Sequence, residues 1–509
     1  MSTTPFRRRR RSDPQHTAVL VVGAGFGGIG LGARLRQAHI TDFTILERTE
    51  DLGGTWSRNT YPGAACDVPS NLYSYAFAPN PDWSRKYGTQ PEILGYLRRV
   101  SDDFGVTPHI RLGTTVTAAR FDEDARLWHV TTDRGEWTAD VLVSAVGAFA
   151  EASIPDIEGL STFTGPLMHT LHWDHDLDLT GKRVAVIGTG ATAVQVIPEL
   201  QQTAEQVVVF QRTAPWIVPR RDRRTSSFER RLYRRIPATQ RASRAAWYAG
   251  IESFGLPGFV HTAFRHPFEA LGRMQLRRQV ADPELRARLA PDYMIGCKRA
   301  IFSDAYYPAM IQPNVDLVTD RIESVIPEGI VTASGTHAVD AIVLATGFTA
   351  MPMLASVVTG TDGRTIEDHY RERPQSFLGV ANAGFPNMFT ILGPFGAAGN
   401  QSAVVMIEAQ ITYIVDALTR IHRAGITRFE LRRDEQEAFV EEMHARAGKG
   451  TWLRGGCSSY YTNGSGMNAG LFPGWSFEYR SRTRRWDAER YELARGRLAR
   501  VDVAEEVSP

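Results

Sequence analysis

Cysteine is scarce in this chain. Its 509 residues include three cysteines, Cys66, Cys297 and Cys457, which lie far apart and form no Cys-x-x-Cys pair. This scarcity weighs against a disulfide framework, a zinc site and a dithiol redox centre. We therefore expect no metal site, and a reducing, cytoplasmic location fits.

An excess of charge of one sign is also missing. The chain has 58 Lys plus Arg against 56 Asp plus Glu, a net charge of +2. This balance argues against a polyanionic partner, so we expect no nucleic acid. Five arginines at positions 7–11 indicate a disordered basic tail, and the arginine-rich stretch 220–235 is typical of a solvated helix face.

Long apolar runs are missing as well. The uncharged stretch 379–407 contains Pro, Asn, Gln and many Gly, which makes it a poor membrane helix. We predict no integral membrane segment. The sequence leaves peripheral membrane contact and the oligomeric state open.

Two glycine-rich turns are present, and each follows a short apolar strand and precedes a helix-like run. In the first, Gly23, Gly25 and Gly28 fit the GxGxxG pattern. These glycines permit the tight turn, the approach of a pyrophosphate and the packing of helix on strand. Glu47 ends the next apolar strand, where an acid binds the hydroxyls of an adenosine ribose. This turn predicts an FAD site.

The second turn contains Gly188 and Gly190, with alanine as the third small residue. The next strand ends in Arg212 and Thr213 rather than in an acid. Arginine can bind a 2′-phosphate that a carboxylate would repel, so this turn predicts NADPH, with Lys298 as a second cation. The alternative is that Arg212 is an ordinary surface arginine.

These patterns predict an α/β fold with two Rossmann-like dinucleotide-binding domains, one for FAD and one for NADP, and a helical insertion. A basic tail would cover 1–15, and the FAD domain 16–150 and 380–509. The NADP domain would cover 151–220 and 293–379, with the insertion at 221–292. An ATG segment in LATGF, 344–348, is typical of the passage between such domains.

Two further stretches resemble the Baeyer–Villiger monooxygenase family of class B flavoproteins. They are GGTWSRNTYPGAACD at 53–67 and FTGPLMHTLHWD at 163–174. The second matches the pattern FxGxxxHxxxW(P/D) through Phe163, Gly165, His169, Trp173 and Asp174. The resemblance spans roughly residues 18–480.

The resemblance implies an enzyme that uses FAD, NADPH and O2 to convert a ketone into an ester or lactone through a C4a-peroxyflavin. Arg299, in a CKR context, matches the family's active-site arginine, and Asp67 matches the acid that pairs with it. A permanent cation would keep the peroxide anionic. The alternative is an ordinary salt bridge between domains.

The resemblance also assigns residues around the cofactors. Thr55, Trp56 and Tyr61 would lie along the isoalloxazine, although the two aromatic residues are equally compatible with a core. His169 would set the relative position of the domains, or serve as a plain structural histidine. Tyr460 takes the place of a tryptophan in a lid loop over the nicotinamide.

Other functions remain to be separated from this one. A flavin-dependent N- or S-oxygenase shares both folds, but soft nucleophiles need no anionic peroxide, so Asp174 and Arg299 favour the ketone reaction. A dithiol reductase of the same fold needs the Cys-x-x-Cys pair that the chain lacks. A non-catalytic nucleotide-binding module would not consume NADPH.

Overall fold

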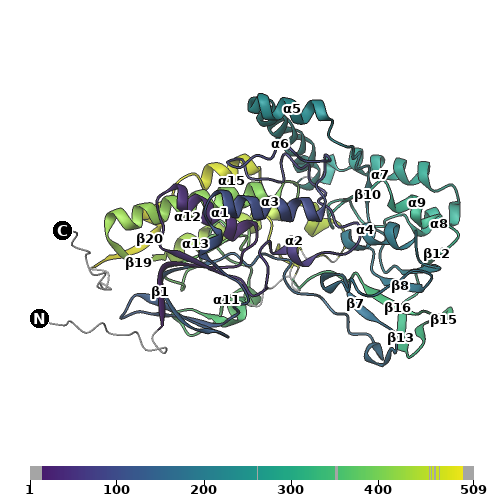
Figure 1. Cartoon of the computed structure of the whole chain (residues 1–509), viewed down its shortest axis with the longest axis horizontal. Coiled ribbons are helices and arrows are strands. Elements are labelled where there is room, and N and C mark those ends of the chain that lie inside the picture. The colour runs from purple at the N-terminus through teal and green to yellow at the C-terminus, as the bar shows by residue number, and fades with distance from the viewer. Residues whose placement is uncertain are drawn as a thin grey trace, which may run out of the picture.

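The computed structural model describes residues 14–260, 262–349, 354–457, 459, 461–462, 466–468 and 470–496. Two sheets organise this part of the chain, and each carries one of the glycine turns. We call each sheet with its helices a unit. The first unit contains β1 (Gln15–Val22) and the second contains β8 (Arg183–Ile187) (Figure 1).

The first unit is built on a mixed sheet of eight strands. Pairing is parallel around β1 and antiparallel from β4 to β6. In spatial order the strands are β17 (Val358–Thr359), β4 (Val116–Asp122), β5 (Leu127–Thr132), β6 (Gly135–Ser144), β1, β2 (Phe43–Leu46) and β3 (Ile110–Arg111), with β18 (Met388–Thr390) also on β6. The consecutive strands β5 and β6 form an antiparallel hairpin within this sheet.

Three helices cover one face of this sheet. They are α1 (Phe26–Gln37), α3 (Gln90–Asp103) and α12 (Ala403–Ala424), whose apolar side chains form one core with those of β1. Glycines in α1 permit close packing, since a Cβ at Gly30 would lie 2.7 Å from the Tyr75 ring. Burial of this apolar surface is the main force that holds the layers together. The short α2 (Thr55–Arg58) follows the first glycine turn.

The second unit is built on a parallel five-stranded sheet. In spatial order its strands are β12 (Val315–Val318), β9 (Gln206–Phe210), β8, β16 (Ala341–Leu344) and β7 (Leu167–His169). The helix α4 (Ala191–Leu200) follows β8, as a βαβ unit requires. A small meander packs beside it and consists of β13 (Ile322–Ile326), β14 (Gly329–Thr332) and β15 (Gly335–Ala338). The predicted pair of Rossmann-like units is confirmed.

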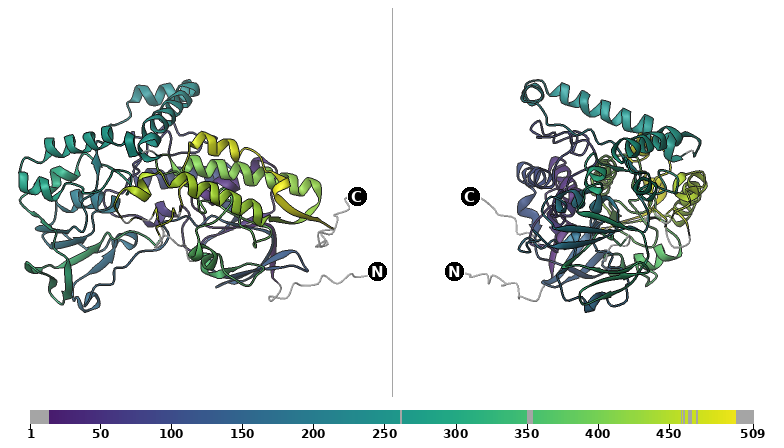
Figure 2. Two further views of the ribbon diagram at one scale, coloured as in Figure 1. Left: turned by 180° about the vertical axis from the view of Figure 1, so that it is seen from behind. Right: turned by 90° about the vertical axis from the view of Figure 1, so that its right-hand side faces the viewer.

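The insertion is helical, as predicted. It lies between the paired strands β10 (Ile217–Val218) and β11 (Ile301–Phe302) and stands above both sheets (Figures 1 and 2). Its helices are α5 (Ser227–Arg235), α6 (Pro237–Val260), α7 (His266–Gln279) and α8 (Pro283–Arg288). Within the described residues, every helix falls short of the length or the apolar character that a membrane span needs.

The chain crosses between the units through two segments that pair with each other. Ser153 N donates to Gly347 O at 2.9 Å, and Thr349 N donates to Glu151 O at 3.1 Å. An antiparallel bridge joins Ala152 to Phe348 between them. Residues 151–153 and 347–349 thus form one two-stranded ribbon, and the LATGF segment lies at the crossing, as predicted.

The return to the first unit occurs earlier than predicted. We expected the second domain to continue to 379, but β17 pairs with β4, and α10 (Leu354–Val357) and α11 (Ile366–Glu372) contribute to the first unit's other core. The boundary at 380 is therefore wrong. A strand of two residues carries no period that a sequence pattern could reveal.

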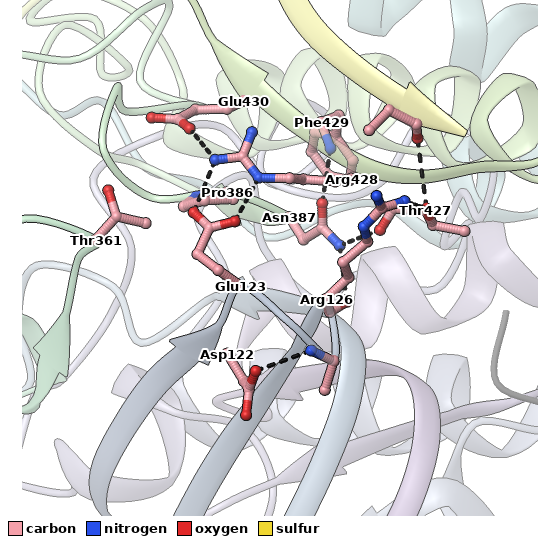
Figure 3. A network of polar contacts seen from close by, with 12 residues as sticks. Asp122, Glu123, Arg126, Thr361, Pro386, Asn387, Thr427, Arg428, Phe429 and Glu430 are labelled. Carbon is pink, nitrogen blue, oxygen red and sulfur yellow. Dashed lines mark hydrogen bonds and ion pairs between the residues drawn. The ribbon is translucent and has the colours of Figure 1, made fainter. Parts of the chain in front are cut away.

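The last described elements lie on the first unit, where β19 (Ile426–Leu431) pairs antiparallel with β20 (Tyr491–Arg495), with α13 (Arg433–Ala447) and α15 (Ser476–Arg482) beside this pair. A polar network ties β19 to the turn between β4 and β5 (Figure 3). Arg428 donates to Glu123 at 2.7 and 2.8 Å and to Glu430 at 2.6 Å. These charge-assisted bonds hold the β19–β20 pair in place.

Candidate active site

The first glycine turn has the geometry of a nucleotide cradle. Gly23 has φ +106°, and a Cβ there would lie 2.7 Å from the Ala145 carbonyl oxygen; at Gly28 it would lie 1.9 Å from Gly23 O. Both positions therefore require glycine. Gly25 precedes α1, whose first turn has no acidic residue and no side-chain cap. Such a helix end suits an anion.

Glu47 belongs to the same turn. Its Oε2 accepts a hydrogen bond from Ala24 N at 2.8 Å, and its Oε1 accepts from Thr49 N and Thr49 Oγ1 at 3.0 and 2.9 Å. The carboxylate is buried, with 7% of its residue surface exposed. It is thus fixed beside the glycine turn, where its remaining lone pairs suit ribose hydroxyls.

The second glycine turn repeats this geometry on β8 and α4. Gly188 has φ +115°, and a Cβ there would lie 2.5 Å from Ala345 O. Gly190 precedes α4, and a Cβ there would meet no described atom within 4 Å. Its backbone therefore faces open space, which suits a pyrophosphate. Thr213 O accepts from Thr189 Oγ1 at 2.8 Å, which fixes the end of β9 next to this turn.

Two cations lie beside the second turn. Burial lowers the pKa of Lys298, and repulsion by the nearby Arg212 lowers it further. The Lys298 ammonium also lies 5.2 Å from the centre of the Tyr293 ring. Arg212 is exposed. The structure thus brings together the two cations that the sequence pairs, and two such charges suit a phosphate dianion.

Asp67 and Arg299 form a bidentate ion pair between the two units. Arg299 Nε donates to Oδ2 at 2.8 Å and Nη2 donates to Oδ1 at 2.7 Å. Asp67 comes from the loop after α2, and Arg299 from the loop before β11. The predicted pairing of these two residues is therefore present in the structure.

The electrostatics of this pair keep both groups ionised. Burial raises the pKa of Asp67. The positive charge and hydrogen bonds of Arg299, with a contribution from Arg220, outweigh this effect and hold the pKa below its ordinary value. The Arg220 guanidinium donates to Cys66 O at 2.9 Å and lies 5.0 Å from the Tyr87 ring centre. Arginine stays protonated in proteins, so this site holds a permanent positive charge.

The aromatic residues assigned to the isoalloxazine lie in different surroundings. Trp56 is buried, and its Nε1 donates to the Tyr73 hydroxyl at 3.1 Å. Tyr61 packs against the core of the second unit, and burial raises its pKa to about 12. Thr55 is exposed at the start of α2. The structure therefore places Tyr61 at the contact between the units rather than in a purely first-unit core.

The segment 163–174 lies on the second unit next to the crossing ribbon. His169 ends β7 opposite Leu344, its Nδ1 accepts from Leu171 N at 3.1 Å, and its ring meets Phe348 edge-on at 6.2 Å. Burial lowers its pKa, and the Gly347 backbone offsets a part of this shift. The neutral imidazole therefore helps to fix the ribbon, and Trp173 packs against the second core.

The expectation about cysteine is wrong in one respect, because Cys297 and Cys457 form a disulfide. The bond joins the loop that carries Lys298 and Arg299 to the segment after α14 (Thr451–Arg454). Met294 N also donates to Gly455 O at 3.1 Å across this contact. A separation of 160 residues hides such a pair in the sequence. Cys66 is a buried free thiol.

One further expectation concerns the C-terminal half. Tyr460, assigned to a lid loop, lies outside the described residues. The loop before α12 ends in Ser402, whose side chain caps the helix by accepting from Val404 N at 3.3 Å. In the described part of the chain, no group of three or more His, Cys, Asp and Glu could hold a metal.

Several residues of this site could not be identified from the sequence. Gln195 on α4 contacts the loop of Asp67, Arg220 supports Asp67, and Tyr73 supports Trp56. Thr192 and Gln195 stand one helical turn apart, and this spacing was the only local signal. Nothing in the sequence shows which partner such a helix face meets.

Two nucleotide cradles on separate sheets, with a guanidinium between them, define an oxidoreductase that uses two dinucleotides. The family model described as pyridine nucleotide-disulphide oxidoreductase matches residues 20–236. A Baeyer–Villiger monooxygenase of Streptomyces coelicolor is 42% identical over 96% of this chain and 94% of its own length. The chain belongs to the Baeyer–Villiger monooxygenase family.

Solved structures agree with this assignment. Cyclohexanone monooxygenase from Rhodococcus, bound to NADP+, is similar with a TM-score of 0.85 and 30% identity, over 95% of this chain and 100% of that chain. OTEMO in complex with FAD and NADP is similar with a TM-score of 0.84 and 29% identity over the same shares.

Proposed function

We propose that this protein is an FAD- and NADPH-dependent Baeyer–Villiger monooxygenase. It inserts one oxygen atom of O2 next to a ketone carbonyl and gives an ester or a lactone. The observation that carries this proposal is the bidentate Asp67–Arg299 pair, which lies where the two nucleotide-binding units meet. Family membership agrees with this reaction.

The residues of the first turn fit FAD. Its glycines leave no room for a side chain, and α1 offers uncapped backbone N–H groups to a pyrophosphate. Glu47 is held by the turn itself and would accept from the adenosine ribose. When bound, the reduced flavin supplies the activation of dioxygen. Trp56 on α2 and Tyr73 in the loop after α2 would line the same side.

The residues of the second turn fit NADPH. Gly190 leaves its backbone open to a pyrophosphate, and Arg212 and Lys298 would share the 2′-phosphate. Arginine offers a fork of donors that matches phosphate, and lysine adds a point charge. NADH lacks this phosphate, so the pair selects NADPH.

Arg299 and Asp67 divide the catalytic work in this chain. Arg299 carries the positive charge that stabilises a developing oxyanion next to the ketone carbon, which is an electrostatic role. Asp67 uses one edge of the planar guanidinium and so fixes its orientation. Because the carboxylate stays ionised, it also moderates the field of the cation. Neither residue needs to transfer a proton in this role.

A ketone panel tests this proposal. Purified protein loaded with FAD is given NADPH, O2 and cyclic or linear ketones, and the esters are measured by gas chromatography. We expect Arg299→Ala to oxidise NADPH but to lose ester formation by a factor of about 100 or more, because the cation is needed only for oxygen insertion. Ester formation at the native rate in Arg299→Ala contradicts the role.

A flavin-dependent N- or S-oxygenase is the competing function. Sulfides and amines in the same assay separate the two, since a soft nucleophile does not need the cation. Sulfoxidation without ester from any ketone favours the competitor. A cytoplasmic location stays a prediction.

A further inference from the structure

The side chain of Gln195 reaches from the second unit to the first. It lies on α4 beyond the second glycine turn. Its Nε2 donates to Ala65 O at 2.9 Å, and its Oε1 accepts from the Tyr61 hydroxyl at 2.9 Å and from Ala65 N at 3.4 Å. Both ends of one amide are therefore used across the contact between the units.

The backbone of this loop also packs directly on α4. A Cβ at Gly63 would lie 2.6 Å from the Gln195 carbonyl oxygen and 3.0 Å from Glu199 Cγ. Thr192 lies close enough to the Tyr61 hydroxyl to lower its pKa in part, against the effect of burial. Thr192, Gln195 and Glu199 share one helix face, since they are spaced by three and four residues. The contact between loop 61–65 and α4 thus extends over two helical turns.

The first unit holds the same loop from the other side. Cys66 N donates to Gly88 O at 2.9 Å, and Gln90 N donates to Ala64 O at 2.9 Å. Asp67 follows directly and binds Arg299. The position of Asp67 therefore depends on a short loop held between residues 88–90 and α4.

We propose that Gln195 is a positioning residue, which fixes loop 61–65 against α4 and thereby sets the place of the Asp67–Arg299 pair relative to the second nucleotide site. This inference rests on the proposed function. Gln195 acts through the loop, because its hydrogen bonds go to Tyr61 and Ala65 and the pair begins two residues later. A displacement of about 1 Å in such a pair can reduce a rate by about 100-fold.

Hydrogen exchange in the FAD-loaded protein without NADPH tests the structural part. Gln195→Leu keeps the size of the side chain but removes its three hydrogen bonds. We expect faster exchange of the amides in residues 60–68 of this variant. Gln202→Ala is the matched control, since among the described residues Gln202 Nε2 donates only to Pro198 O, four residues earlier in the same segment. Its exchange should equal that of the wild type.

Coupling of NADPH oxidation to ester formation tests the functional part. In Gln195→Leu the ester formed per NADPH should fall about tenfold, while the KM for NADPH changes less than about twofold. A variant that only lowers the folded fraction reduces both consumption and ester and leaves their ratio unchanged.

Gln195→Glu adds a pH signature. Its carboxylate still accepts from Tyr61 but cannot donate to Ala65 O until it is protonated. Burial beside Asp67 raises the pKa of such a carboxyl, so coupling should recover as the pH falls from about 8 to about 6. Gln195→Leu should show no such recovery.

The outcomes separate the two proposals. Wild-type exchange and wild-type coupling in Gln195→Leu overturn the role of Gln195. If the wild-type protein makes no ester from any ketone, the proposed function fails, and the exchange experiment still decides whether Gln195 holds the loop.

Discussion

Replacing Arg299 with alanine should destabilise the fold by an amount that depends on pH. The variant leaves the Asp67 carboxylate without its bidentate partner in a site where 17% of its side-chain surface is exposed. Removal of one partner of a buried pair costs about 3 to 5 kcal/mol. Arg220 still contributes a positive charge near Asp67, and 34% of the Arg299 side chain is exposed. We therefore expect the free energy of unfolding to fall by an amount at the lower end of this range, about 3 kcal/mol at about pH 7.

The sign of the pH dependence follows from the pKa of Asp67. In the wild type this pKa is lowered, so the pair stabilises the fold above the unfolded pKa and stops doing so as the pH falls through the folded pKa. Without Arg299, burial dominates and raises the pKa of Asp67. The free energy of unfolding of the variant is then lowered above the pKa that Asp67 has in the unfolded chain, about 3.9. The difference in unfolding free energy between the wild type and Arg299→Ala should therefore shrink as the pH falls from about 7 to about 4.5.

Urea unfolding of the FAD-loaded proteins at several pH values measures this difference. Midpoints of the same transition are compared, since a chain with two sheets can unfold in more than one step. Arg183→Ala is the control: its pair with Asp340 is 38% and 35% exposed, so solvent screens it and its loss should change the stability little. The double variant Asp67→Asn, Arg299→Ala should regain part of the lost stability. A loss that is constant with pH, or no recovery in the double variant, refutes this reasoning.

Two other predictions concern the second cradle and the disulfide. Arg212→Ala should raise the KM for NADPH by about 10- to 100-fold without changing the KM for NADH, because only NADPH carries the phosphate; steady-state kinetics with both cofactors decide this, and an equal rise for both contradicts it. Thiol titration of the denatured, unreduced protein should find only Cys66 free. Reduction of Cys297–Cys457, which closes a loop of 160 residues, should lower the urea midpoint, and chain entropy sets an upper limit of about 5 kcal/mol. Three titratable thiols per denatured chain would show that the bond does not form.

Local features of this protein could be predicted from sequence. Gly23 and Gly188 adopt positive φ angles in turns whose strand, glycines and helix are contiguous, so the pattern and the structure coincide. The positive charge after β9 could also be predicted, since Arg212 lies two residues beyond the end of that strand. The pairing of Asp67 with Arg299 spans 232 residues and came from family resemblance, not from spacing.

Tertiary features could not be predicted. The contact of Gln195 with Ala65 spans 130 residues and depends on how two separately formed units meet. The disulfide escaped notice for the same reason, because sequence distance says nothing about the approach of two loops. The early return at β17 was missed, since its pairing with β4 involves only two residues. In each case long-range packing decided the result.

The ribbon formed by residues 151–153 and 347–349 restrains the chain where it crosses between the two units. Two separate chain segments would permit sliding and twisting, whereas two strands that are hydrogen-bonded side by side act as one ribbon. Such a ribbon bends readily perpendicular to its plane and resists shear along its strands. Bending at this crossing is therefore easier than sliding along it, and His169 packs against Phe348 beside the ribbon.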